Sequence, residues 1–295
     1  MPQARFIDGR LLASLKGQVL KEKISQFAAE SGVIPTLHVI LIGQHAASKV
    51  YVENKQIACH AVGIRSYVHP FPAHSSEEEV LAKIHQLNQD RTAHGILLQL
   101  PLPSALNRQR LLCAVDPLKD VDGLHPYNLG RLMMGDPVLV PCTPKGCLEL
   151  IRSVKPVIEG LYAVIVGRSL LVGKPMAGLL VNANVTVTVA HSYTQNLDTL
   201  CRQADILITA TGTPLFFKDH FIKQGAVVID VGINRLLSQQ GVSSIVGDVD
   251  IHSAQRVAGF ITPVPGGVGP MTISCLLENT LQAAQQQLLS SASSK

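Results

Sequence analysis

The sequence predicts an α/β protein of two domains, the second of them a Rossmann-like, doubly wound parallel sheet. With 295 residues, the chain has about the length of two domains that each bury a core. Short apolar runs alternate with helical stretches through its second half, as expected of parallel strands joined by crossover helices. The stretch Ala163–Pro175 joins a buried strand to a helix through a loop bounded by glycines, an arrangement that suits a phosphate group.

The composition is that of a globular protein, with 46% hydrophobic and 16% charged residues. A net charge of +4, without a run of basic residues and without tryptophan, argues against nucleic acid as a partner and is compatible with a small anionic ligand. Asp8 and Arg10 stand where a signal peptide needs an apolar core, and no apolar stretch approaches the roughly 20 residues of a membrane span. We therefore expect a cytoplasmic protein without a membrane partner.

The spacing of cysteine and histidine gives no metal signature. The six cysteines form no CxxC pair, and the eleven histidines form no HExxH motif or comparable cluster. We expect reduced thiols and no metal site.

The first domain is expected to contain a strand at Leu37–Gly43 and a helix at Ala47–Ala61, which Gly63 ends. The helix has an apolar stripe that is expected to pack, formed by Val50, Ile57 and Ala61.

The other face of this helix carries Ser48, Tyr51 and Lys55, spaced i, i+3 and i+7. One interpretation is a solvated face with a single lysine. The other is a lysine beside an aromatic ring in a pocket, available for proton transfer if partial desolvation lowers its pKa. The residues alone leave both interpretations open.

A second strand is expected at Ile64–Phe71, then a helix capped by Ser76, then an apolar strand within Gly95–Pro103. Gln99 lies near the carboxyl end of that strand, where α/β folds place ligand contacts, although a core amide would fit equally well. The turn-rich segment that follows holds polar side chains that Asx turns explain only in part: Lys119, Asp120, Asp122, His125 and Asn128.

The glycine loop of the second domain matches neither common phosphate loop. Five residues separate Gly167 from Gly173, where a Walker A loop has four, and Arg168 and Ser169 stand where GxGxxG has a glycine. A plain strand-to-helix turn therefore competes with a cofactor site. The next strand, Thr186–Thr194, ends in hydroxyls and lacks the acid that binds an NAD ribose, which favours NADP over NAD.

A loop rich in glycine and proline, Pro263–Pro270, precedes the last predicted helix, Thr272–Leu289. It is either a hinge or a place where a planar ligand approaches the backbone closely.

Taken together, these segments resemble the bifunctional methylenetetrahydrofolate dehydrogenase/cyclohydrolase family. The resemblance covers nearly the whole chain and is carried, in this order, by SKVYVENK, GILLQLPLP, KDVDGLHPYNLGRL, PCTPKG, VGRSLLVGKP, VIDVGIN, GDVD and TPVPGGVGPMT. It implies that Lys55 is the catalytic lysine, that Tyr51 stacks on the folate, that Gln99 hydrogen-bonds near Lys55, and that Asp122 holds the pterin.

The resemblance also implies a folate-lining loop and an NADP site. The loop would contribute Pro263, Gly266, Gly267 and Gly269. NADP would be bound by Gly167, Arg168, Ser169, Ser192 and Ile233.

The implied architecture is two α/β domains across a cleft. Residues 1–142, joined by a C-terminal helix at 271–290, would form a folate-binding catalytic domain, and residues 143–270 an NADP-binding domain. A homodimer through the cofactor domains is implied, together with oxidation of 5,10-methylenetetrahydrofolate and hydrolysis of the product. The alternatives are a dehydrogenase without cyclohydrolase activity, an NADP-linked oxidoreductase of the shikimate dehydrogenase kind, and a nucleotide-sensing protein.

Overall fold

The computed structural model describes residues 3–43, 45–237 and 243–292. The chain forms two compact units: unit 1 comprises Met1–Ser14 and Thr143–Thr272, and unit 2 comprises Leu15–Cys142 and Ile273–Lys295. Met1–Ser14, expected in the first domain, therefore belongs with the Rossmann-like unit instead. Two long helices, α1 (Gly9–Ser31) and α10 (Val268–Ala292), contribute residues to both units.

Unit 2 is built on a parallel sheet with the strand order β3-β2-β4. Its strands are β2 (Thr36–Ile42), β3 (Arg65–Phe71) and β4 (Gly95–Leu98). Besides most of α1 and α10, its helices are α2 (Ala46–Val62), α3 (Glu77–Gln89), α4 (Arg108–Ala114) and α5 (Pro126–Met133).

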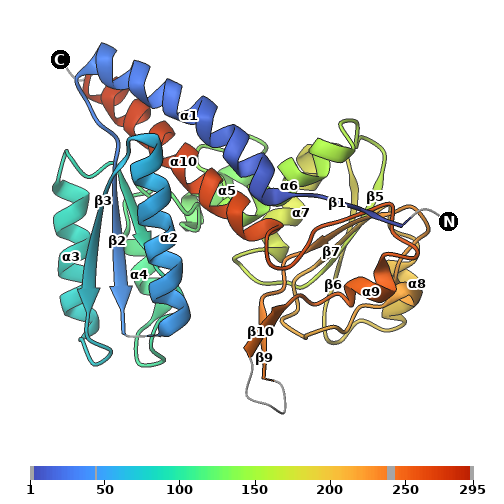
Figure 1. Ribbon diagram of the computed structural model, residues 1–295. Coiled ribbons are helices and arrows are strands. Elements are labelled where there is room, and N and C mark those ends of the chain that lie inside the picture. Colours follow the sequence, from blue (N-terminus) through green and yellow to red (C-terminus); the bar gives the residue numbers. More distant parts are fainter. Residues whose placement is uncertain (1–2, 44, 238–242, 293–295) are drawn as a thin grey trace. The chain divides into compact units, whose positions relative to one another are not determined.

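The side chains of β2 alternate between two layers of core in unit 2. Leu37 and Leu41 belong to a hydrophobic cluster with residues of α1, α2 and α10, whereas Ile40 and Ile42 pack with α3 and α4. Figure 1 shows α1 and α10 side by side within this unit. Because both faces of the sheet are covered, β2 is buried along its whole length.

The helix predicted at Ala47–Ala61 is confirmed as α2, but its buried face differs from the prediction. Val50 and Ile57 are 56% and 68% exposed, and Ala61 is exposed as well. The helix instead buries a longer stripe at alternating spacings of four and three residues: Ser48, Val52, Lys55, Cys59 and Val62. The expectation that Val50, Ile57 and Ala61 pack is wrong, because Val52, Cys59 and Val62 are the residues of this helix that join the core cluster, and Lys55 is buried in the same stripe.

Unit 1 is built on a six-stranded parallel sheet with the order β1-β11-β8-β7-β5-β6. Its strands are β1 (Arg5–Phe6), β5 (Tyr162–Val166), β6 (Thr186–Ala190), β7 (Ile206–Thr209), β8 (Val227–Asp230) and β11 (Phe260–Ile261). Its helices include α6 (Cys142–Val154), α7 (Gly173–Asn182), α8 (Leu197–Cys201), α9 (Ile251–Ala254) and the 3₁₀ helix η1 (Asp219–Phe221). The predicted α/β class and Rossmann-like sheet are confirmed.

Both faces of the unit 1 sheet are covered. Ala163 and Ile165 of β5 pack in a cluster with α6 and α7, whereas Val164 and Val166 pack on the other side with α8, α9 and η1. The sequence did not predict the separate antiparallel pair of β9 (Asn234–Leu237) and β10 (Ser243–Val246), which Figure 1 shows projecting from this unit.

Two further findings concern thiols and membranes. All six cysteines are free thiols, and all but Cys113 are buried. Within the described part of the chain, no helix combines the length and the apolar character that a membrane crossing requires.

A histidine pair in unit 2 gives the first testable prediction. His38 Nδ1 lies 2.9 Å from His69 Nε2, and His38 is only 7% exposed. Burial, reinforced by His69, lowers the pKa of His38 to about 4; Lys119 and Lys83 act in the same direction, and Asp90 opposes them. Because the folded pKa lies below the ordinary value, this site stabilises the fold above about pH 6.5 and loses that stability as the pH falls toward about 4.

We expect the shifted pKa of His38 to contribute about 3 kcal/mol to the free energy of unfolding above pH 6.5. Urea unfolding of the wild type and of His38→Gln between pH 7 and pH 4.5 should show a smaller loss of stability in the variant. His85→Gln, at an exposed histidine of α3, is the matched control and should keep the wild-type slope. Equal slopes in wild type and His38→Gln would contradict this account.

Candidate active site

The candidate active site of unit 2 is built around Lys55. Its side chain is only 5% exposed, and its Nζ donates a hydrogen bond of 2.9 Å to Gln99 Oε1. The ammonium group also lies 4.5 Å from the centroid of the Tyr51 ring, one helical turn earlier on α2. The interpretation of a solvated lysine is therefore wrong: Lys55 is buried beside an aromatic ring, and its part in proton transfer stays a prediction.

Gln99 is fixed in the orientation that Lys55 needs. It follows the last residue of β4, and its backbone N–H donates to Ile40 O at 2.9 Å, which continues the ladder beyond the strand. The side-chain Nε2 donates to Leu100 O at 2.7 Å. Because the amide nitrogen is engaged in this way, the oxygen is left facing the lysine.

Burial perturbs both ionisable groups of the site toward their neutral forms. It lowers the pKa of Lys55, and the negative charge of Asp122 opposes that effect. It likewise raises the pKa of Asp122, and the charge of Lys55 opposes that effect. Such a pair can give up or accept a proton more readily than the same groups in water, which is what general acid–base chemistry requires.

The segment that carries Asp122 is held from α10 by a residue that sequence analysis missed. Asn279 is fully buried, and its Nδ2 donates to Val121 O at 2.9 Å and to Val140 O at 2.8 Å. Gly123 has a φ of 72° and no room for a side chain, since a Cβ there would lie 2.5 Å from Pro141 N. Asp122 is therefore placed by backbone contacts on both sides of it.

The neighbouring polar residues, which the sequence left unexplained, support the fold. Lys119 Nζ donates to three carbonyl oxygens at the end of α3, those of Leu87, Asn88 and Asp90. Asp120 accepts from His125 N at 2.7 Å and from Asn128 Nδ2 at 2.9 Å. Of the two aspartates in this turn, Asp122 is the one next to Lys55.

A second candidate site lies in unit 1, at the carboxyl ends of the parallel strands. The strand order places the topological switch point between β5 and β7, where such sheets bind dinucleotides. Gly167 there has a φ of 137°, and a Cβ on it would lie 2.4 Å from Ala210 O. A Cβ on Gly173 would lie 2.0 Å from Gly167 O. The loop and the start of α7 therefore meet in a cradle that only glycine fits.

The other predicted cofactor residues of unit 1 surround this cradle or lie along the same edge of the sheet. Ser169 Oγ accepts from Val172 N at 3.1 Å, just before α7, and the Arg168 guanidinium lies 5.6 Å from the centroid of the Tyr193 ring. Ser192 is exposed in the turn after β6, which ends earlier than predicted, and Ile233 is 68% exposed after β8. This arrangement offers the positive end of the α7 dipole and a cation to a phosphorylated ligand.

The loop predicted to line the folate site packs within unit 1 on the start of α1. Gly267 N donates to Pro263 O at 2.8 Å, and Arg10 N donates to Gly266 O at 3.1 Å. Gly269 lies in the first turn of α10, which begins at Val268 rather than at the predicted Thr272. The structure therefore groups Lys55, Gln99, Tyr51 and Asp122 in unit 2, and this loop with the glycine cradle in unit 1.

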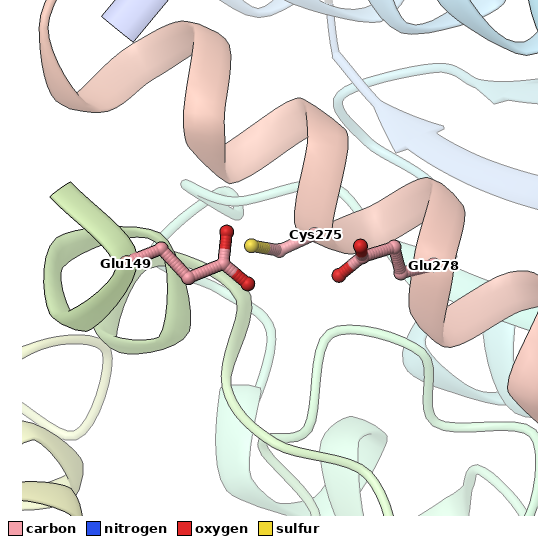
Figure 2. A group of neighbouring side chains, drawn as sticks. All are labelled: Glu149, Cys275 and Glu278. Atoms are coloured by element: carbon pink, nitrogen blue, oxygen red, sulfur yellow. The ribbon is translucent and has the colours of Figure 1, made fainter. Parts of the chain in front are cut away.

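Figure 2 draws three residues of metal-ligating types, Glu149 on α6 and Cys275 and Glu278 on α10. Glu149 belongs to unit 1 and the other two to unit 2, so neither unit supplies the set by itself. Glu278 already forms a 2.8 Å ion pair with Lys16 of α1. We therefore propose no metal site at these residues.

Comparison with known families shows that both units match domain models of the same protein family. Residues 7–122 match the model for the tetrahydrofolate dehydrogenase/cyclohydrolase catalytic domain, and residues 141–288 match the model for the NAD(P)-binding domain of the same family. The chain belongs to the tetrahydrofolate dehydrogenase/cyclohydrolase family. The resemblance drawn from its motifs is thereby confirmed.

Relatives of this family match almost the entire chain. The bifunctional protein FolD of a Bradyrhizobium strain is 50% identical over 282 residues, which cover 95% of this chain and 96% of the relative. FolD 2 of Paracoccus denitrificans is 52% identical over 279 residues, covering 94% of this chain and 92% of the relative.

Solved structures of the family agree with this fold. The bifunctional enzyme of Campylobacter jejuni has a TM-score of 0.91 at 44% identity and covers 96% of this chain and 99% of its own. The dehydrogenase-cyclohydrolase of Trypanosoma brucei, complexed with NADP cofactor and an inhibitor, has a TM-score of 0.94 at 37% identity, with coverage of 98% and 99%. A shikimate dehydrogenase from Aquifex aeolicus, at 12% identity, 88% and 98% coverage and a TM-score of 0.51, shares the fold alone.

Proposed function

We propose that this chain oxidises 5,10-methylenetetrahydrofolate to 5,10-methenyltetrahydrofolate with NADP⁺ and hydrolyses that product to 10-formyltetrahydrofolate. The observation that carries the proposal is the buried Lys55–Gln99 pair beside Tyr51 and Asp122. A dehydrogenase alone needs no proton-transfer group of this kind. The family membership of both units supports the substrate class and the NADP cofactor.

For the oxidation, NADP⁺ supplies the hydride acceptor, and the residues of unit 1 supply its binding site. The glycine cradle fits a bound phosphate because the absence of side chains at Gly167 and Gly173 lets the N-terminal end of α7, with its positive dipole, lie close to the carboxyl end of β5. We assign Arg168, Ser169 and Ser192 to the polar contacts and Gly167 and Ile233 to close backbone and apolar contacts. The lone pair of the neighbouring folate nitrogen stabilises the cation that forms, so the protein mainly orients the reactants.

For the hydrolysis, we assign proton transfer to Lys55. Water adds to the methenyl carbon and loses one proton, which gives a neutral carbinolamine. The bond from that carbon to N5 then breaks, the remaining hydroxyl proton leaves as the formyl C=O forms, and N5 takes up a proton. The reaction releases one proton overall. A lysine whose pKa burial has lowered can carry the proton between these atoms, while Gln99 holds its ammonium group in place.

We assign the remaining site residues to substrate binding. Tyr51 offers a ring for stacking on the folate, and Asp122 offers a carboxylate to the nitrogens of the pterin. The Pro263–Pro270 loop, with Pro263, Gly266, Gly267 and Gly269, is assigned to the folate site as well. We also propose that the protein is cytoplasmic and forms a homodimer through the NADP-binding unit, as the family resemblance implies. Sedimentation velocity tests whether it is a dimer.

The role of Arg168 gives a second testable prediction. Arg168→Ala should raise the KM for NADP⁺ roughly 10- to 100-fold, because a charge-assisted hydrogen bond to the 2′-phosphate is lost. The KM for NAD⁺, which lacks that phosphate, should change little. Arg202→Ala, at an exposed arginine of the same unit that pairs with Asp198, is the control. Equal effects of Arg168→Ala on both nucleotides would contradict the assignment.

The experiment that tests the proposed function separates the two reactions. Purified protein is given 5,10-methylenetetrahydrofolate with NADP⁺ or NAD⁺, and in a second assay 5,10-methenyltetrahydrofolate without nucleotide. We expect NADPH in the first assay and hydrolysis above the uncatalysed rate in the second. Hydrolysis at the uncatalysed rate would mean that the protein is a dehydrogenase without cyclohydrolase activity. The absence of both reactions would mean that it only binds a nucleotide.

A further inference from the structure

One buried carboxylate of unit 1, that of Asp248, ties together two loops at the carboxyl edge of the sheet. Asp248 has an exposed fraction of 0%. Its Oδ2 accepts from the backbone N–H of Thr211 at 2.6 Å, from the Thr211 hydroxyl at 2.8 Å and from Gly212 N at 3.0 Å. Its Oδ1 accepts from Asn234 Nδ2 at 2.9 Å. The loop after β7 and the segment after β8 therefore share one acceptor group.

These two loops border the proposed NADP site from one side. The loop after β7 lies against the glycine cradle, because Ala210 O is the atom that a Cβ on Gly167 would meet at 2.4 Å. In the segment after β8, the proposed cofactor residue Ile233 stands between Gly232 and Asn234. A Cβ on Gly232 would lie 2.2 Å from Asp248 Oδ1, so this backbone rests directly on the carboxylate.

A second buried carboxylate holds Asp248 in turn. Asp230, at the end of β8, accepts from Asp248 N at 3.0 Å and from Gly232 N at 2.9 Å through Oδ1, and from Val249 N at 2.9 Å through Oδ2. Gly247 has no room for a side chain beside it, since a Cβ would lie 1.9 Å from Asp230 Oδ2. The segment GDVD and the segment VIDVGIN are thus joined by carboxylates and tight backbone contacts.

We propose that Asp248 is a positioning residue for NADP binding, which fixes the loop after β7 and the segment around Ile233 against the bound dinucleotide. This inference rests on the proposed function and extends it to a residue that does not contact the cofactor. An ionised carboxylate only accepts hydrogen bonds, and each of the four groups around Asp248 donates one. An amide of the same shape would set its own N–H₂ against these donors and would leave some of them unpaired.

The test is Asp248→Asn, with NADP⁺ binding measured by isothermal titration calorimetry and hydrolysis of 5,10-methenyltetrahydrofolate measured without nucleotide. We expect the Kd for NADP⁺ to rise roughly 10- to 100-fold, since one or two charge-assisted hydrogen bonds that order the site are lost. The kcat of hydrolysis should stay within about twofold, because Lys55 and Gln99, to which proton transfer is assigned, lie in unit 2.

Asp205→Asn is the matched control. Asp205 is also a carboxylate that accepts a backbone bond, from Tyr162 N at 3.0 Å, and pairs with Lys223, but it lies before β7 at the amino edge of the sheet. The variant Asp205→Asn should be less stable than the wild type but should bind NADP⁺ with an unchanged Kd. Thr211→Val, which keeps the shape and removes one donor, should raise the Kd about 3- to 10-fold, and it replaces Asp248→Asn if that variant does not fold.

A wild-type Kd in folded Asp248→Asn, or in Thr211→Val where it stands in, would overturn the positioning role and leave the proposed function intact. An equal rise of Kd in Asp205→Asn would also overturn it, because general loosening of unit 1 would then explain the effect. A wild-type chain that binds no NADP⁺ would overturn the proposed function and this inference together.

Discussion

Lys55→Met is expected to reduce the hydrolysis of 5,10-methenyltetrahydrofolate about 100- to 10,000-fold, the usual share of a positioned proton-transfer group. Methionine fills the space of the lysine stem, but it leaves Gln99 Oε1 and Asp122 without their cationic partner, so some loss of stability is expected alongside the loss of hydrolysis. The binding of NADP⁺, assigned to unit 1, should persist. Single-turnover hydrolysis and calorimetric titration with NADP⁺ measure the two effects.

Lys49→Met is the control for this prediction, because Lys49 is exposed on the same helix. It should hydrolyse the substrate at the wild-type rate. Unchanged hydrolysis in Lys55→Met would remove Lys55 from the mechanism. Loss of NADP⁺ binding along with hydrolysis would point instead to a disturbed fold.

Gly173→Ala is expected to weaken NADP⁺ binding roughly 100-fold or more. The new Cβ would lie 2.0 Å from Gly167 O and 2.6 Å from its carbonyl carbon, so the start of α7 must move away from the loop. That movement displaces the positive end of α7 and the loop that carries Arg168 and Ser169 from the dinucleotide they are proposed to bind, and charge-assisted hydrogen bonds lost in this way are worth about 1.5–3 kcal/mol each. Hydrolysis of 5,10-methenyltetrahydrofolate should continue.

Gly17→Ala provides the contrast, because nothing lies within 4 Å of a Cβ at that position of α1. It should leave the Kd for NADP⁺ unchanged and stabilise the protein by about 0.5–1 kcal/mol. Titration of both variants with NADP⁺ decides the matter. Wild-type affinity in Gly173→Ala would mean that the cradle does not hold the cofactor.

The sequence predicted the site of unit 2 better than the packing around it. Helical spacing placed Tyr51 and Lys55 on one face, and the family resemblance implied that Gln99 bonds near Lys55; the structure places all three within hydrogen-bond or ring contact. The face of α2 that packs was predicted wrongly, because a stripe that contains Ser48 and Lys55 looks polar when each residue is judged alone. A lysine enters such a stripe only because Gln99 and Asp122 surround it, and both are distant in sequence.

Long-range hydrogen bonds explain what the sequence could not reveal. Asn279 contacts carbonyl groups of Val121 and Val140, and Asp248 contacts Thr211, yet nothing local in their sequence marks these partners. Asp120 and Asp122 look alike in the motif, and only the bonds from His125 and Asn128 assign Asp120 to the fold. Helix α1 also went unpredicted, since its buried residues are spread among many charged ones.

The most direct test of the account follows both products of the wild-type protein in one vessel, with 5,10-methylenetetrahydrofolate and NADP⁺. The account predicts that NADPH and 10-formyltetrahydrofolate rise together, and that NAD⁺ in place of NADP⁺ gives much less of either. NADPH with 5,10-methenyltetrahydrofolate accumulating at the uncatalysed rate of hydrolysis would contradict it, because the buried Lys55–Gln99 pair would then have no part in the chemistry.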